Sequence, residues 1–199
     1  FDYWLLLAKK NDHRAMARLG VMLLGEKGDY FNLIYMSGKG VEKNYPEAHK
    51  YFESGAKLGN KDCIIYLGKF YDAGFGVKKD VKKAIAFYYL GTQYQDMEAA
   101  FYLANSRADV KKLKLNYKII NEADKIIQQS SRFYIEVPEL EDYTIHDPTL
   151  SQKIDEIIAG KYKDIESEST SAPENKTESA KPVKEQEKSV GYEKTDQDQ

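Results

Sequence analysis

Residues 62–99 decide the fold, and they read DCIIYLGKFYDAGFGVKKDVKKAIAFYYLGTQYQDMEA. Within them, 62–73 and 81–93 each repeat apolar residues at spacings of three and four, which predicts two amphipathic helices. Gly74 follows the first pattern, and glycine readily adopts the left-handed conformation that ends many helices. Asp80 precedes the second pattern, where its carboxylate can accept hydrogen bonds from the unpaired N–H groups of the first turn. The stretch therefore predicts one helical hairpin.

The same hairpin pattern recurs upstream at a constant shift of 36 residues. This shift relates a set of small and apolar residues, Gly38, Gly40, Val41, Ala48 and Gly55, to Gly74, Gly76, Val77, Ala84 and Gly91. The Leu-Gly pair at 19–20 matches the pair at 67–68 at a shift of 48 instead. The difference of 12 residues predicts an insert at 26–37. A fixed period of this size is typical of stacked helical repeats.

The predicted insert is too apolar for a solvated loop, since it contains Tyr30, Phe31, Leu33, Ile34 and Tyr35. We expect Gly25 and Gly28 to end the first helix of this repeat. A further helical stretch is expected to begin at Asp29 and to dock on the core. The alternative is one long helix that runs through Glu26.

The residues between Leu67 and Ala84 carry a recognisable motif: Leu-Gly, Tyr71, Gly-x-Gly-Val, Asp80 and Lys-Ala. This motif resembles the Sel-one-like repeat family, relatives of the tetratricopeptide repeats, and the resemblance covers roughly residues 3–102. It implies an all-α fold, an α-solenoid of antiparallel helical hairpins. It also implies a protein–protein interaction scaffold or adaptor whose partners are other proteins. Among compartments it favours the bacterial cell envelope or secretion, while the cytoplasm stays open.

The predicted organisation has three parts. They are a helical-repeat domain at 1–130 (a partial repeat 1–25 with the insert 26–37, repeats 38–59 and 60–95, and a degenerate capping repeat 96–130), an irregular segment with a short amphipathic helix at 131–163, and a disordered polar tail at 164–199. Terminal repeats of a solenoid are atypical because they present a polar outer face. In the capping repeat, the periodicity predicts one helix from Val110 to about Gln129.

The segment that follows the repeats contains one clear helical pattern. Asp147-Pro148 is a typical helix opening, Leu150, Ile154, Ile157 and Ile158 form one apolar stripe, and Gly160 is expected to end the helix. From Asp164 onward apolar periodicity is lost, and Ser, Thr, Glu, Lys, Gln, Pro and Asp dominate. We therefore expect the chain after about Lys163 not to pack on the repeats.

Bulk composition excludes several classes of protein. The 199 residues carry a net charge of −2, so there is no general basic field for nucleic acid. A single cysteine excludes an internal disulfide framework. The apolar run Trp4–Ala8 is far too short to cross a bilayer, so no membrane span is predicted. The chain starts without Met, inside a second-helix pattern, which indicates a fragment or a processed chain.

Catalytic and metal-binding patterns are weak. His13 and His49 lack a Cys or His at ligand spacing, and we expect surface or helix-end roles for both. His146-Asp147 with Ser131 would be a forced catalytic triad, since no strand-turn-helix nucleophile motif is present. Cys63 is predicted to be a buried, inert thiol. The basic cluster at 78–83 is expected to be a solvated face, with an acidic partner patch as the alternative. We predict no catalytic residue, cofactor or metal, and no enzyme. The alternative is a regulatory or envelope-anchored subunit of an enzyme complex whose active or anchoring part lies outside this chain.

The candidate partner-binding surface follows from the repeat register. In a hairpin solenoid the first helices of successive repeats line the concave face, and Leu19, Leu67 and Leu103 are expected to point into the core. Beside these leucines and one turn further on lie the candidate binding residues, Arg18, Tyr66, Lys69, Tyr102 and Asn105. Aromatic rings and cations are enriched at protein interfaces. The alternative is that Tyr66 and Tyr102 pack between neighbouring repeats.

Overall fold

The computed structural model describes residues 1–25, 41–132 and 144–166. Within these ranges the regular elements are helices, together with two isolated antiparallel bridges. In chain order the helices are α1 (Asp2–Ala8), α2 (His13–Met22), α3 (Tyr45–Lys57), α4 (Lys61–Ala73), α5 (Val81–Gln93), α6 (Met97–Asn105), α7 (Arg107–Lys112), α8 (Lys118–Arg132) and α9 (Leu150–Ile158). The predicted insert, Gly38, Gly40, residues 133–143 of the predicted irregular segment and the chain from 167 onward lie outside the described residues.

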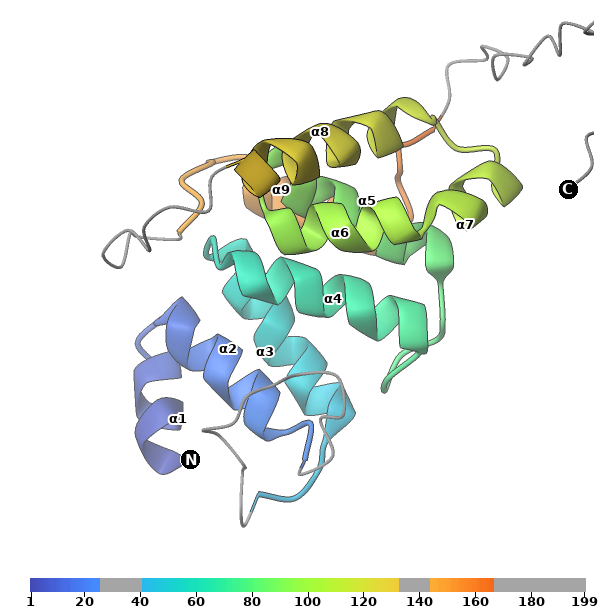
Figure 1. Ribbon diagram of the computed structural model, residues 1–199. Helices are drawn as coiled ribbons and strands as arrows, with labels where there is room; N and C mark the ends of the chain where they lie inside the picture. The colour runs from blue at the N-terminus through green and yellow to red at the C-terminus, as the bar shows by residue number, and fades with distance from the viewer. Residues whose placement is uncertain (26–40, 133–143, 167–199) are drawn as a thin grey trace, which may run out of the picture.

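The helices form successive antiparallel hairpins (Figure 1). Helix α2 packs on α3, α4 packs on α5, and α6 packs on α8. The second helix of each pair also contacts the first helix of the next, as α3 does with α4 and α5 with α6. The predicted all-α solenoid of antiparallel hairpins is thereby confirmed. Leu19, Leu67 and Leu103 are fully buried, as the repeat register predicts.

The turns that open α2, α4 and α6 confirm the shifts of 48 and 36 residues. Each first helix is capped by a side chain that accepts backbone N–H groups, from Asp12, Asn60 and Asp96 respectively. The residue before each cap has positive φ, with values of 62° at Asn11, 95° at Gly59 and 60° at Gln95. The hairpins therefore share one turn geometry even where their sequences differ.

The turn between α4 and α5 has the predicted conformation. Gly74 ends α4 with φ 80° and ψ 34°, and its N–H donates to the carbonyl of Phe70 at 2.8 Å. The side chain of Asp80 then caps α5 by accepting from the N–H of Lys83 at 3.0 Å. Gly25, which follows α2, also has positive φ. Both glycines lie where the helical pattern was expected to end.

Replacing Gly74 with valine is expected to lower the free energy of unfolding by about 1–2 kcal/mol, because β-branched residues clash in the left-handed region. A Cβ there would also lie 3.2 Å from the Cβ of Lys79. Thermal or urea unfolding measures the loss. Ala73→Val is the control, since Ala73 is exposed and ends the same helix with ordinary helical geometry. Equal effects of the two substitutions would contradict the expectation.

Glycines let the aromatic side chains of the second helices approach the first helices. A Cβ at Gly20 would lie 2.5 Å from a ring carbon of Phe52, and one at Gly68 would lie 2.4 Å from a ring carbon of Tyr88. These two pairs are equivalent in the repeat register. Their geometry shows that the small residue of the Leu-Gly motif is required for packing rather than for backbone freedom.

The predicted helix from Val110 to about Gln129 is wrong. Helix α7 ends at Lys112 and α8 begins at Lys118, and it is α8 rather than α7 that packs along α6. Residues 113–117 are held out of helix by a distant part of the chain. Leu115 forms a backbone bridge with Glu166, and the N–H of Asn116 donates to the carbonyl of Ile165 at 2.9 Å.

Residues 144–166, called the 144–166 segment below, run back over the repeats. The segment starts at the α3–α4 turn, where the N–H of Ile145 donates to the carbonyl of Gly59 at 2.8 Å. A Cβ at Gly59 would lie 2.5 Å from the carbonyl oxygen of Ile145. The predicted stripe of α9 is confirmed, although the helix begins at Leu150 rather than directly after Asp147. The expectation that packing stops after Lys163 is wrong, because Ile165 is 1% exposed.

Candidate interaction surface

Two stacked aromatic pairs join the successive hairpins. The ring of Tyr66 on α4 stacks on Phe52 of α3, with centroids 4.4 Å apart and an interplanar angle of 4°. The ring of Tyr102 on α6 stacks on Tyr88 of α5 at 5.2 Å and 19°. Tyr66 is 8% exposed, while Tyr102 is half-buried. Each tyrosine therefore packs between neighbouring repeats.

Lys69 lies between these two tyrosines. Its Nζ is 5.3 Å from the ring centroid of Tyr66 and 4.5 Å from that of Tyr102, and it bonds Oε1 of Glu98 at 2.6 Å. Its side chain is 12% exposed. Desolvation lowers the pKa of Lys69, and the bond to Glu98 only partly offsets this. The pKa of Tyr66 is raised well above its usual range by desolvation and then by the charge of Asp62.

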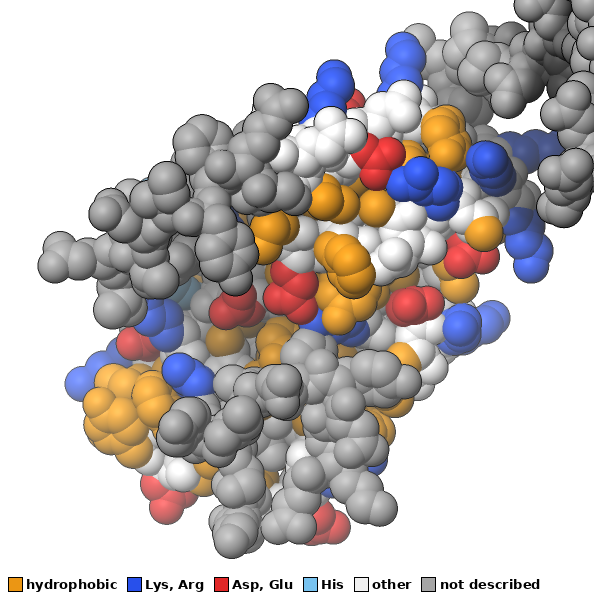
Figure 2. All heavy atoms as spheres, viewed as in Figure 1, with side chains coloured by type: hydrophobic (Ala, Val, Ile, Leu, Met, Phe, Trp, Pro, Cys, Tyr) orange, Lys and Arg blue, Asp and Glu red, His pale blue; other side chains and the backbone are white. Residues whose placement is uncertain are grey.

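Carboxylates border this cluster on the first helices. Desolvation raises the pKa of Asp62, and the charges of Asp96 and Glu98 raise it further, while Lys69 and Arg18 oppose the change. The pKa of Asp96 is also raised, mainly by desolvation. Figure 2 shows acidic side chains interspersed with hydrophobic ones on this side of the molecule. The surface is therefore mixed in character, apolar in part and acidic in part.

The structure brings together three of the five candidate residues, Tyr66, Lys69 and Tyr102. Arg18 is exposed, and its charge, like that of Lys69, acts on the carboxylate of Asp62. Asn105 is exposed at the end of α6. Sequence reasoning missed the carboxylates. Asp62 and Glu98 are separated by 36 residues, the repeat shift, and each lies one turn before a candidate tyrosine. That recurrence was the signal that could have identified them.

Two exposed apolar side chains on α6 also escaped the sequence analysis. Phe101 is 55% exposed and Met97 56% exposed, one turn apart on the same helix. The ring of Phe101 meets Tyr102 edge to face, with centroids 6.2 Å apart. Exposed aromatic residues beside polar groups are typical of partner-binding surfaces. Phe101 and Met97 therefore extend the candidate surface beyond the five predicted residues.

The histidines take structural positions. His13 opens α2, as expected, and its ring bonds the amide of Asn60 at 3.2 Å and the hydroxyl of Thr144 at 3.1 Å. The expectation for His49 is wrong, because this residue is buried and its ring lies 5.4 Å from that of Tyr71. Its Nε2 has no hydrogen-bond partner among the residues that the structure describes. His49 is therefore a core residue that packs on aromatic rings, and it does not have the surface or helix-end role that was expected.

The buried His49 predicts a pH-dependent stability. Its pKa is lowered from the ordinary value of 6.5 chiefly by desolvation, while Glu53 opposes the shift and Lys83 adds to it. Below about pH 6.5 the unfolded chain binds a proton that the folded chain does not, so acidification favours unfolding. We expect the free energy of unfolding to fall between pH 7 and pH 5 by at most about 1.4 kcal/mol per pH unit from this group.

The matched comparison is His49→Ile, because Ile85 fills the equivalent position of the next repeat and is fully buried. Urea unfolding at several pH values measures both proteins. The fall between pH 7 and pH 5 should be shallower in the variant, since only the histidine contribution is removed. Parallel curves for the two proteins would show that His49 titrates alike in the folded and unfolded states.

Cys63 has the predicted environment. It is fully buried, and a Cβ at Gly55 would lie 2.6 Å from its Sγ. Desolvation raises the pKa of the thiol well above its usual range, so the reactive thiolate is strongly disfavoured. Across residues 1–25, 41–132 and 144–166, no three His, Cys, Asp or Glu side chains are grouped in a way that could bind a metal ion. None of the helices in these ranges combines the length and apolar character needed to span a bilayer.

Part of the chain matches the sequence model of a known repeat. Residues 13–60 and 61–93 match the sequence model of the Sel1 repeat. This chain contains Sel1 repeats. The first matched range includes the insert that the two shifts predict. Sel1 repeats generally mediate protein interactions, and they are typically non-enzymatic modules. No curated protein sequence matches the chain.

Two solved structures of Sel1-type proteins resemble this one. A Sel1 repeat protein from Oxalobacter formigenes superposes with a TM-score of 0.53 at 21% identity, covering 80% of this chain. The present chain spans 62% of that protein's length. A protective antigen of uropathogenic Escherichia coli strains with an SLR fold gives a TM-score of 0.45 at 20% identity, covering 70% of this chain and 29% of the antigen. The Oxalobacter likeness supports the Sel1 fold of this chain, and no more than the fold.

Proposed function

We propose that this chain is a protein-interaction scaffold, or adaptor, and that its partner binds across the first helices α2, α4 and α6. The observation that carries the proposal is the surface around Lys69. There, Tyr102 and the exposed Phe101 present aromatic area, and Glu98 presents a carboxylate that the largely buried Lys69 holds in place. Aromatic anchors beside charged groups characterise the energetic centres of protein interfaces.

The five candidate residues have different parts in this proposal. Arg18 and Asn105 are exposed and supply directional donors at the two ends of the surface. Tyr102 supplies ring area at its centre. Tyr66 and Lys69 are largely buried, so they support that surface from beneath and offer a partner little area of their own. Binding is therefore expected to depend most on Tyr102, Phe101 and the exposed donors.

Site-specific photo-crosslinking in the native cell tests the proposal. A photoreactive phenylalanine analogue is placed at Phe101, at Asn105, and at the control position Lys112, which is exposed on α7. We expect a discrete crosslinked protein from positions 101 and 105 and none from 112. Arg18→Glu should weaken that crosslink, with circular dichroism confirming that the variant is folded. Equal crosslinking at all three positions, or none at 101 and 105, would reject this surface.

A further inference from the structure

The helix α9 occupies a groove between two second helices of the repeats. It lies against α3 and α5, the second helices of two successive hairpins. Its stripe of Leu150, Ile154 and Ile157 is buried there, while Ser151 and Gln152 on its other side face solvent. The surfaces of α3 and α5 thus receive an amphipathic helix that is not itself part of a repeat.

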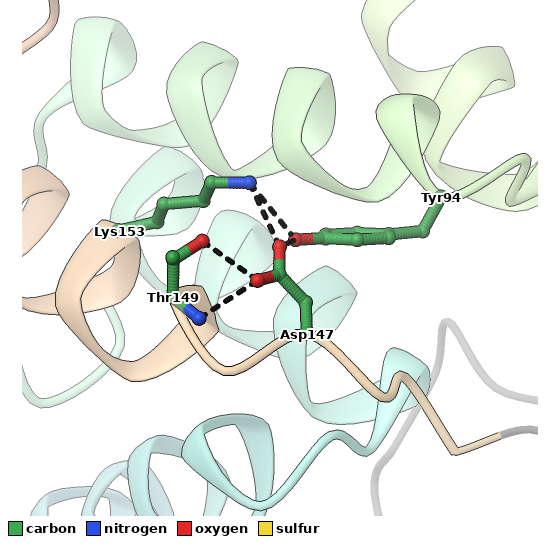
Figure 3. A network of polar contacts seen from close by, with 4 residues as sticks. All are labelled: Tyr94, Asp147, Thr149 and Lys153. Carbon is green, nitrogen blue, oxygen red and sulfur yellow. Dashed lines mark hydrogen bonds and ion pairs between the residues drawn. The ribbon is translucent and has the colours of Figure 1, made fainter.

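One end of the groove binds a carboxylate. The hydroxyl of Tyr94, at the end of α5, donates to Oδ2 of Asp147 at 2.6 Å (Figure 3). Nζ of Lys153 donates to the same carboxylate oxygen at 2.9 Å and to the Tyr94 oxygen at 3.2 Å. Thr149, followed by Tyr94 and Lys153, holds the pKa of Asp147 well below its usual range. Among these three partners Tyr94 is the one that belongs to the repeats, and its hydroxyl supplies a hydrogen bond to a carboxylate that precedes a docked helix.

The middle and the other end of the groove each present a lysine. Nζ of Lys57, on α3, bonds Oδ1 of Asp155 at 2.6 Å. Nζ of Lys83, on α5, donates to the carbonyl of Ile158 at 2.8 Å. The last carbonyls of a helix lack partners within the helix and carry partial negative charge, so a lysine stabilises that end. Tyr94 and Lys83 lie at opposite ends of α5, and together they fix the direction of a docked helix.

These contacts define a recognition pattern. Apolar residues lie at i, i+4 and i+7, which are Leu150, Ile154 and Ile157. One carboxylate, Asp147, lies three residues before the first apolar residue, and a second, Asp155, lies at i+5. Across the groove the charges are complementary at Lys57 of the repeats and Asp155 of the docked segment, whereas Lys153, which pairs with Asp147, belongs to the docked segment itself. Such charge complementarity gives an interface its specificity and register.

We propose that the groove between α3 and α5 is a binding site for an amphipathic partner helix of this pattern, and that α9 fills it as a tethered competitor. Docking of α9 is intramolecular, and tethered ligands commonly act at effective concentrations of about 1 mM. A free helix of equal affinity therefore competes poorly, and the groove opens only when α9 is weakened or a tighter helix arrives. This site is separate from the surface around Lys69.

A labelled peptide with the sequence of residues 144–166 is the probe, and fluorescence anisotropy measures its binding to the full chain. Ile154→Glu places a charge in the buried stripe and should release α9, with circular dichroism confirming that the repeats stay folded. We expect the variant to bind the peptide at least about tenfold more tightly than the unmodified chain. Adding Lys57→Glu should weaken this binding, and a peptide with Asp155→Lys should restore it.

A second measurement covers the case in which Ile154→Glu unfolds the protein. A protease site is placed within residues 133–143 of the full chain, and cleavage turns the unmodified α9 into a separate fragment. The labelled peptide should then replace that fragment. Absence of saturable binding by a folded Ile154→Glu chain, or a cleaved fragment that never exchanges, overturns the proposal. Peptide-independent dimers that swap α9 would also overturn it, because the occupant would then be a second copy.

Discussion

Replacing Tyr66 with alanine is expected to lower the free energy of unfolding by about 3 kcal/mol, the loss typical of truncating a buried aromatic side chain. Tyr66 is 8% exposed, and its ring stacks on Phe52 with centroids 4.4 Å apart. Truncation removes that stack and the face on which Lys69 rests, and it leaves a cavity between two repeats. Urea unfolding monitored by circular dichroism measures the change.

The control is Tyr3→Ala, since Tyr3 is 65% exposed and its loss should stay within about 0.5 kcal/mol. A loss below about 1 kcal/mol for Tyr66→Ala would show that the repeats close over the gap. A destabilised Tyr66→Ala protein cannot report on partner binding. Tyr66→Phe keeps the stacked ring and is the variant to use in a binding assay.

Adding one methyl group at Gly68 is expected to cost about 2 kcal/mol, although alanine favours helix more than glycine does. The new Cβ would lie 2.4 Å from one ring carbon of Tyr88 and 2.7 Å from another. Tyr88 is fully buried, and Tyr102 stacks on it, so its ring cannot move aside freely. Overpacking of this kind strains both helices of the hairpin.

A double-mutant cycle isolates that contact. In a Tyr88→Leu background the ring is absent, so Gly68→Ala should be neutral, or stabilising by up to about 1 kcal/mol through helix propensity. Gly20→Ala with Phe52→Leu is the equivalent cycle one repeat earlier. If Gly68→Ala costs the same in both backgrounds, the glycine is required for a reason other than the approach of the ring.

Local patterns predicted the repeats well because each repeat carries its own signals. Gly74, Asp80 and the apolar spacing of α4 and α5 fix one hairpin through turn and capping chemistry that involves neighbouring residues only. The shifts of 36 and 48 then extend this hairpin along the chain. The equivalent caps of α2, α4 and α6 show that the register was correct across the predicted insert.

Long-range contacts account for the wrong predictions. The break between α7 and α8 depends on the pairing of Leu115 with Glu166, two residues that are 51 positions apart. No local signal at 113–117 outweighs the apolar period that continues through it. Ile165 was assigned to a polar tail for the same reason, since a single apolar residue shows no periodicity and yet fills a buried position.

The repeat register predicted which candidate residues lie close together, but it did not predict how exposed each of them is. The repeat shift related Tyr66 to Tyr102 and placed Lys69 nearby, and the structure shows both rings within reach of the Lys69 ammonium. How far the ring of Tyr66 or Tyr102 is buried depends on the aromatic side chain that the preceding second helix, α3 or α5, packs against it. The rings of Phe52 and Tyr88 pack against glycines of the preceding first helices and stack on Tyr66 and Tyr102. These stacked contacts join different repeats, so local sequence patterns do not reveal them.

The turn at Gly59 has a consequence for how the sequence can vary. At the equivalent turns, Asn11 and Gln95 adopt the same left-handed backbone, so the turn itself tolerates a side chain. At Gly59 the carbonyl of Ile145 occupies the space that a Cβ would need. The effect of a substitution at Gly59 therefore depends on whether the 144–166 segment is docked. A Gly59→Asn change that would be mild in the repeats alone becomes severe once the 144–166 segment docks, so the tolerated residue at position 59 and the presence of that segment are epistatically linked.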